Sequence, residues 1–245
     1  RSEKVAYQVK GNIEPVQKLR TVTGLVSVKA LKEIAHKFGA TINQFLTAVY
    51  FEALLMDKKY SNKQQKYPVK ISVPVNMRKF FPSVTLRNFS QFVNMELPVD
   101  MEDGGFEQIL ERVKEESKNF NIDYLQGSIN GNVRSERNFL VRVMPLAVKN
   151  FALNLIYNRV GERQFTSTLT NIGQIKLPAK ASEYIEHYFM VLGATKLNKI
   201  NLTAISYGDE CALTFSTRLQ ETAIIRNFFQ KLTAFGIEAK VFSNY

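Results

Sequence analysis

The sequence predicts a layered α/β (α+β) domain in which helices pack on a mixed β-sheet. Segments with helical and with strand-like patterns alternate along the chain, and no unit repeats at a fixed interval. The chain has 245 residues and is 45% hydrophobic, which is enough for one sizeable core. No break in composition divides it. We therefore expect a lead-in over residues 1–23 and a single lobe over residues 24–245.

The first elements are a pair of helices. Apolar residues at helical spacing predict a helix over Ser27–Phe38, and Gly39 ends it. Thr41 and Gln44 match a capping box, in which each residue bonds to the backbone of the other. They predict the start of a second helix that continues to Leu55.

The middle of the chain combines strands with further helices. Alternating or apolar runs predict strands over Val69–Val75 and Phe92–Val99, and a helix begins near Phe106. Residues 120–163 have a mostly helical pattern. The part from Phe139 onward is basic and amphipathic. We expect a helix packed on the sheet there, with a membrane-surface helix as the alternative.

The last third predicts mainly strands. A strong amphipathic helix over Ile224–Phe235 ends at Gly236, and Gly208 and Asp209 supply a turn between two strands. The predicted strands are Gln164–Thr170, Met190–Gly193, Asn201–Tyr207, Ala212–Thr217 and Ile237–Phe242.

The chain is strongly basic, with a formal net charge of +11. Such a charge suits nucleic acid, an anionic membrane surface or a phosphorylated ligand such as coenzyme A. The lysines and arginines are spread along the whole chain, and this weakens the nucleic-acid interpretation. The most apolar stretch, Phe139–Tyr157, is interrupted by Arg142, Pro145 and Lys149, so it does not predict a membrane-spanning helix.

Few residues offer catalytic or metal-binding chemistry. The sequence has no phosphate-binding loop, dinucleotide-binding glycine motif or nucleophile elbow. One cysteine and two distant histidines predict no metal site. His36, near a helix end, and His187, among aromatic residues, are more typical of structural histidines. We predict that Cys211 is an inert thiol on a buried strand, and a lone cysteine is typical of a cytoplasmic protein.

Two segments place small polar residues at the ends of apolar strands. The first is Val73–Arg78, continued by Leu86–Asn94, and the second is Ser167–Gly173. Binding and catalytic sites are often built at such strand ends, although ordinary turn chemistry explains these residues equally well.

These segments resemble motifs of one acyltransferase superfamily. The first is similar to the P-V-N-x-R, N-F and F-V-N signature of condensation domains and bacterial alcohol-acetyltransferase-like proteins. The second resembles the T-I-S-N-L-G segment of dihydrolipoamide acyltransferases. The helix pair over Val28–Leu55 and the ending over Leu202–Val241 also resemble this superfamily. Nearly the whole chain thus resembles the C-terminal half of a chloramphenicol acetyltransferase-like acyltransferase.

The resemblance implies one half of a two-lobed fold with an active-site tunnel between the lobes. In condensation-type members the first lobe supplies the base, in a His-His-x-x-x-Asp-Gly motif, which takes a proton from the acceptor. This chain lacks that motif, because Ala40 follows His36 at the aspartate position and Val191 follows His187. The resemblance therefore implies that the isolated chain does not catalyse acyl transfer.

The resemblance also assigns roles to individual residues. Thr170 matches a serine whose hydroxyl can stabilise the oxyanion of the tetrahedral intermediate. Asn171 and Gly173 would shape the adjoining turn, and Arg78 would tie strands together or border the tunnel. The remaining matches to the tunnel and crossing segments are Asn76, Asn88, Phe89 and Asn94.

The leading hypothesis is a lobe that helps to move an acyl group from a thioester to a hydroxyl or amine. The thioester would be acyl-CoA or carrier-bound, and Lys79 and Arg87 are candidates to hold its phosphates. The expected partners are an N-terminal lobe, an acyl carrier protein and a second copy of the isolated lobe. The alternatives are a non-catalytic module that binds an acyl carrier or another protein, and a basic protein that binds nucleic acid or a membrane surface.

Overall fold

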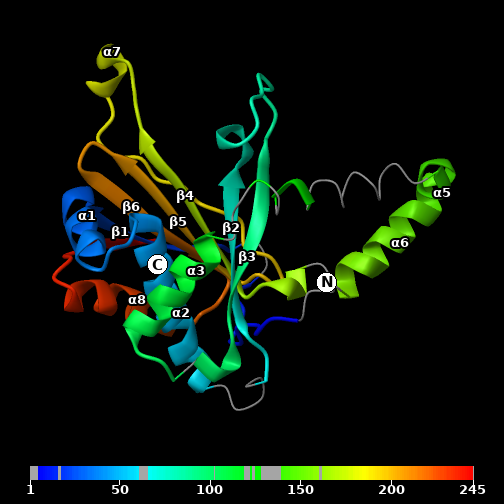
Figure 1. Ribbon diagram of the computed structural model, residues 1–245, viewed down its shortest axis with the longest axis horizontal. Coiled ribbons are helices and arrows are strands. Elements are labelled where there is room, and N and C mark those ends of the chain that lie inside the picture. Colours follow the sequence, from blue (N-terminus) through cyan, green and yellow to red (C-terminus); the bar gives the residue numbers. More distant parts are fainter. Residues whose placement is uncertain are drawn as a thin grey trace.

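The computed structural model describes residues 5–15, 18–60, 66–101, 103–118, 122, 125–127, 139–159 and 162–244. Within these residues, a seven-stranded mixed sheet carries helices against one face (Figure 1). The predicted α+β layered fold with a mixed sheet is confirmed.

The sheet has the strand order β3-β2-β4-β5-β6-β1-β7. Strand β4 is parallel to β2 and β5, and the other neighbouring pairs are antiparallel. The strands are β1 (Arg20–Ser27), β2 (Val69–Asn76), β3 (Ser90–Leu97), β4 (Ser167–Ile175), β5 (Ile200–Tyr207), β6 (Glu210–Thr217) and β7 (Lys240–Ser243).

Helix α2 begins where its capping box predicts. In α2, the backbone N–H of Gln44 donates to Oγ1 of Thr41 at 3.2 Å, and the backbone N–H of Thr41 donates to Oε1 of Gln44 at 2.9 Å. The described helices are α1 (Val28–Lys37), α2 (Ile42–Lys59), α3 (Phe106–Lys118), α5 (Phe139–Val143), α6 (Leu146–Arg159), α7 (Ala179–Ser182) and α8 (Ala223–Ala234).

The main core lies between the sheet and helices α1, α2, α3 and α8. Its centre is an aromatic cluster in which the rings of Tyr50 and Phe228 pack edge to face against Phe215, with centroids 5.5 and 5.1 Å away. The Tyr50 hydroxyl lies 2.6 Å from Oγ of Ser167, which itself donates to the carbonyl of Ile200. Because Ser167 gives its single hydroxyl proton to Ile200, the Tyr50 hydroxyl is the donor to Ser167. Burial raises the pKa of Tyr50, which keeps this hydroxyl protonated.

Strand β1 was not predicted from the sequence. Residues 20–23, assigned in the sequence analysis to a lead-in, pair with β6, and Tyr7 and Val9 are buried in the core. Gly24 obscures the strand pattern because it has no side chain in the middle of an otherwise apolar buried strand. A Cβ atom at Gly24 would lie only 2.2 Å from Cε1 of Phe229, which fills the space instead.

An irregular segment covers part of the other face of the sheet. The carbonyl of Met190 accepts a hydrogen bond from the Thr203 hydroxyl, and the carbonyl of Gly193 accepts one from Nδ2 of Asn201 at 2.9 Å. The strand predicted over Met190–Gly193 is therefore wrong. These carbonyls bond to side chains of β5 and form no strand ladder.

The basic stretch after Phe139 is helical, but its predicted packing on the sheet is wrong. Helices α5 and α6 form an arm that stands away from the sheet (Figure 1). Large apolar side chains such as Leu146 and Phe151 are 72% and 73% exposed on it. Most of the earlier part of this helical prediction, residues 120–121, 123–124 and 128–138, lies outside the described residues.

Candidate functional site

The sheet splits between β2 and β4. The parallel ladder between these two fully described strands has two residue pairs, Ile71–Ser167 and Ser72–Thr168, and the strands then spread apart (Figure 1). Pro74 follows on β2, and a proline has no N–H to donate to a neighbouring strand. The chain thus forms a cleft between the end of β2 and the end of β4.

This cleft brings together the two polar segments that the sequence analysis singled out. Its volume is about 840 Å³. Residues 73–76 line the β2 side, residues 168 and 170–173 line the β4 side, and Asn43 and Ser117 come from the ends of two helices. Segments about a hundred positions apart in the sequence therefore face one another.

The β4 side is shaped by an irregularity in the strand. The backbone N–H of Gly173 donates to Oδ1 of Asn171 at 2.9 Å, and the register of β4 against β5 shifts between these two residues. Gly173 has a φ of 82°, a left-handed conformation that favours glycine. The bulge leaves Ile172 half exposed on the cleft wall.

Thr170 presents an uncommitted hydroxyl to the cleft. Two residues earlier on β4, the Thr168 hydroxyl accepts a hydrogen bond from Nδ2 of Asn198 at 3.2 Å. No hydrogen bond to the half-buried Thr170 hydroxyl is present among the described residues. This hydroxyl is therefore free to donate to a group that enters the cleft.

The β2 side is held by a network around Arg78. Oδ1 of Asn76 accepts from the backbone N–H of Arg78 at 3.0 Å, at the start of a short 3₁₀ turn over Met77–Lys79. Nη2 of Arg78 donates to the carbonyls of Thr85 and Arg87 at 2.8 and 2.7 Å. Arg78 thus fastens the loop between β2 and β3 rather than entering the cleft.

We expect Arg78→Met to loosen this loop. Methionine keeps much of the aliphatic stem but removes both hydrogen bonds, so we expect a stability loss of about 1 kcal/mol. Chymotrypsin should then cleave the loop faster at Phe80 or Leu86, as measured by mass spectrometry. Lys180→Met, on exposed helix α7, is the matched control and should leave the cleavage rate unchanged. Equal cleavage of the wild-type and Arg78→Met chains would contradict the assigned role.

Three further residues of this segment occupy different positions. Asn88 lines the cleft, and its Oδ1 accepts from the Ser90 hydroxyl at 2.8 Å. The carbonyl of Phe89 accepts from the backbone N–H of Met77 at 3.0 Å, and its ring packs on a small apolar cluster beside the cleft. Asn94 pairs with Ser72 across the β2–β3 ladder and does not line the cleft.

The cleft is electrically neutral. Its described lining residues are apolar side chains, amides and hydroxyls, and none is charged. Arg87 is exposed outside this lining, and the side chain of Lys79 lies outside the described residues. Lys70 is buried and forms an ion pair with Glu96 at 2.8 Å. The basic residues therefore contribute little charge to the cleft itself.

Sequence reasoning missed two polar residues of the cleft, Asn43 and Ser117. Asn43 lies in the first turn of α2, and its buried Oδ1 has no hydrogen-bond partner among the described residues. Ser117 lies at the end of α3, and its hydroxyl donates to the carbonyl of Val113 at 2.7 Å. The only signal for Asn43 was its place just after a capping residue, which does not indicate a site.

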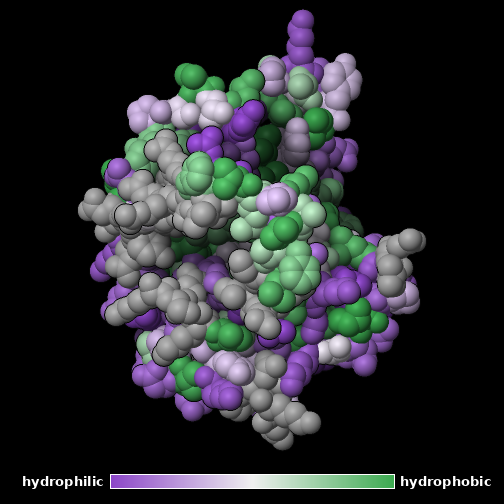
Figure 2. Space-filling view, turned by 90° about the vertical axis from the view of Figure 1, so that its right-hand side faces the viewer, coloured by the Kyte–Doolittle hydropathy of each residue, from purple (hydrophilic) through white to green (hydrophobic). Residues whose placement is uncertain are grey.

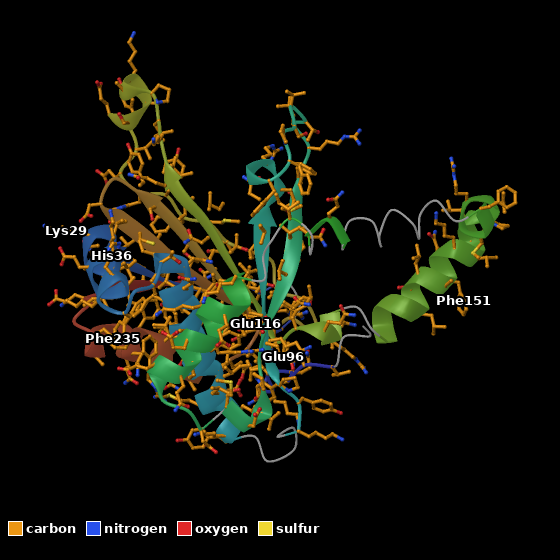
Figure 3. All side chains as sticks on the ribbon, in the orientation of Figure 1. Lys29, His36, Glu96, Glu116, Phe151 and Phe235 are labelled. Carbon is orange, nitrogen blue, oxygen red and sulfur yellow. The ribbon has the colours of Figure 1, made fainter. Side chains whose placement is uncertain are left out.

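Neither histidine belongs to the cleft. His36 lies on α1, on the opposite side of the body from the arm (Figure 3). Nδ1 of His187 lies 2.7 Å from Oε1 of Glu210, in a separate hollow beside the β5–β6 turn. Burial raises the pKa of the Cys211 thiol, which disfavours a reactive thiolate. The part of the chain that the structure describes contains no group of three or more metal-ligating side chains.

Comparison with known proteins identifies the fold through solved structures. No protein-family model and no curated protein matches the sequence. The wax ester synthase/diacylglycerol acyltransferase from Marinobacter aquaeolei VT8 superposes with a TM-score of 0.58 at 13% identity, over 94% of this chain and 51% of that one.

Two further structures have the same fold. The TRI3 trichothecene 15-O-acetyltransferase from Fusarium sporotrichioides matches with a TM-score of 0.54 at 12% identity, over 96% of this chain and 48% of that chain. A structure concerned with condensation-domain-mediated chain release from the enacyloxin polyketide synthase matches with a TM-score of 0.53 at 13% identity. The match covers 93% of this chain and 42% of that chain. The chain therefore shares the fold of these condensation-domain and acyltransferase structures, and it spans about half the length of each of the three.

Proposed function

We propose that this chain is the C-terminal lobe of an acyltransferase. The enzyme would move an acyl group from a thioester of coenzyme A or of a carrier protein to a hydroxyl or amine acceptor. The observation that carries this proposal is the cleft between β2 and β4, where Asn76 and the uncommitted hydroxyl of Thr170 line opposite sides. The likeness of the fold to acyltransferase structures supports the same conclusion.

The chemistry assigned to the cleft is stabilisation of an oxyanion. When an acceptor oxygen or nitrogen attacks the thioester carbonyl, the carbonyl oxygen gains negative charge in a tetrahedral intermediate. The Thr170 hydroxyl would donate a hydrogen bond to that oxygen. The intermediate then collapses, the carbon–sulfur bond breaks, and the thiolate leaves and takes up a proton. A lining without charged side chains leaves this donor free of competing ion pairs.

The base that removes the acceptor proton would come from a second lobe. Neither histidine of this chain lines the cleft. A lobe with a His-x-x-x-Asp motif, packed over the cleft, would supply the missing base. We therefore propose that the 245-residue chain alone has no transferase activity.

An acyl-transfer assay tests this proposal. The full-length gene product that contains these residues should release free thiol from acetyl-CoA, or from an acetylated carrier protein, when a panel of alcohols and amines is supplied. The 245-residue chain should release none above the buffer rate, because it lacks the base. A folded full-length product that is inactive with both donors and every acceptor would contradict the proposal.

A non-catalytic binding module is the second candidate. It is favoured by the neutral cleft and by the absence of a histidine from its described lining. Such a module would hold an acylated carrier protein without reaction. Calorimetric titration with acylated and unacylated carrier protein distinguishes the two cases when the thiol-release assay is negative.

A further inference from the structure

The arm formed by α5 and α6 exposes many large apolar side chains and has no partner among the described residues. Figure 2 faces the arm, and hydrophobic side chains gather in its centre. Phe139 is 74% exposed, and Phe151 points outward from α6, far from Phe235, which packs against the core (Figure 3). Isolated exposed apolar residues are ordinary, but a continuous group of this size marks an interaction surface.

The apolar residues of α6 do not form a single stripe. The exposed ones are Leu146, Val148, Phe151, Leu153 and Leu155. At about 100° of rotation per residue, Leu146 and Leu153 lie on the side of the helix opposite Val148 and Leu155. A helix that is apolar on several sides is typical of a protein interior, whereas a membrane-surface helix needs one apolar and one polar face.

The charge of the arm narrows the choice of partner. Residues 139–159 include Arg142, Lys149 and Arg159 and no acidic residue. The whole chain carries a formal charge of +11, so two copies would repel one another. A partner with carboxylates around an apolar groove would complement both the positive charge and the apolar surface of the arm.

The total surface of the chain is large for its mass. Its accessible surface is 14893 Å², whereas a compact monomer of 28.0 kDa exposes about 11,100 Å². The chain thus exposes more surface than a compact lobe of its mass would, as is expected where an arm stands away from the sheet. The chain also spans only about half of the structures that share its fold.

We propose that α6 is buried inside a second, acidic lobe of the same protein. An apolar groove of that lobe would enclose Leu146, Phe151 and Leu155, and its carboxylates would face Arg142 and Lys149. The arm would then hold the two lobes together, while the cleft between β2 and β4 supplies the chemistry. This inference rests on the proposed function only for the existence of a second lobe, and not for acyl transfer.

Amide hydrogen exchange tests this inference in the full-length gene product and in the 245-residue chain. We expect the backbone amides of α6 to exchange at least about 100-fold more slowly in the full-length product, because opening then requires separation of the lobes. Phe151→Asp combined with Leu155→Asp should abolish that protection. Val241→Asp replaces an apolar residue on β7 that is about as exposed as Leu155, and it should leave the protection intact.

The isolated chain shows whether the variants fold. Circular dichroism should give the same melting temperature for the wild-type and double-variant 245-residue chains, because both side chains are exposed there. Equal exchange of α6 in the full-length product and the isolated chain would overturn the inference. It would also be overturned if the full-length product carries no further lobe, or if the double variant keeps its protection.

Two other occupants are outcomes of the same measurement. Protection of α6 in the isolated chain that rises with protein concentration would assign the arm to a second copy. Protection that appears only with vesicles of phosphatidylcholine and phosphatidylglycerol would assign it to an anionic membrane surface. Either result overturns the proposal. A full-length product that protects α6 but transfers no acyl group would refute the proposed function and leave the inference standing.

Discussion

Replacing Thr170 with valine in the full-length gene product is expected to lower kcat for acyl transfer by about 10²–10³-fold. Valine has nearly the shape of threonine, so the cleft wall keeps its form while the hydroxyl is lost. The hydrogen bond from this hydroxyl strengthens only as the oxyanion develops. The loss should therefore fall on kcat, with KM little changed.

Two matched variants separate this role from a structural one. Thr170→Ser keeps the donor and should retain kcat within about tenfold, a smaller loss than removal of an oxyanion donor causes. Thr168→Val makes the same change two residues away, where the hydroxyl accepts from Asn198, and it should affect stability more than kcat. If Thr170→Val and Thr168→Val have the same kcat, the Thr170 hydroxyl is not an oxyanion donor.

Replacing Phe228 with alanine is expected to lower the free energy of unfolding by about 3–5 kcal/mol. Phe228 on α8 is fully buried, and its ring packs edge to face on Tyr50 and Phe215. These rings join α8, α2 and β6, so the substitution leaves a cavity where three elements meet. The structure has little freedom to close that cavity.

Urea unfolding followed by circular dichroism measures this effect in the 245-residue chain. Phe242→Ala is the control, because Phe242 lies on the edge strand β7 with 43% of its surface exposed. That control should cost less than about 1 kcal/mol, as surface substitutions usually do. If Phe228→Ala and Phe242→Ala lower the free energy of unfolding equally, the packing of α8 on the sheet is not as described.

Local signals in the sequence predicted much of the fold. The capping box of Thr41 and Gln44 fixed the start of α2, because it depends on residues only three positions apart. The amphipathic pattern over Ile224–Phe235 and the turn at Gly208 likewise located α8 and the β5–β6 hairpin. In each case the chemistry that specifies the element lies within the element itself.

Features that depend on distant contacts could not be predicted in this way. Gly24 hid strand β1 because its missing side chain is replaced by Phe229 from another element. The carbonyl of Met190 accepts a hydrogen bond from the Thr203 side chain on β5, and no local pattern distinguishes that arrangement from a strand. The apolar residues of α6 predicted a packed helix, because the sequence does not show which partner covers them.

In the candidate site, too, the local motifs could be predicted from the sequence, but the contacts between distant segments could not. The polar strand ends containing Asn76 and Thr170 were recognisable as motifs, but their meeting across one cleft depends on where β2 and β4 separate. Asn43 joins the cleft from a helix end, and no spacing in the sequence connects it with either motif.

The most direct test of the account is a crystal structure of the full-length gene product with a non-hydrolysable acyl-thioester analogue. We predict that the analogue lies in the cleft between β2 and β4, with its carbonyl oxygen at about 3 Å from the Thr170 hydroxyl, a normal hydrogen-bond distance. A structure in which the analogue binds elsewhere, with the cleft filled by side chains of the second lobe, would contradict the account.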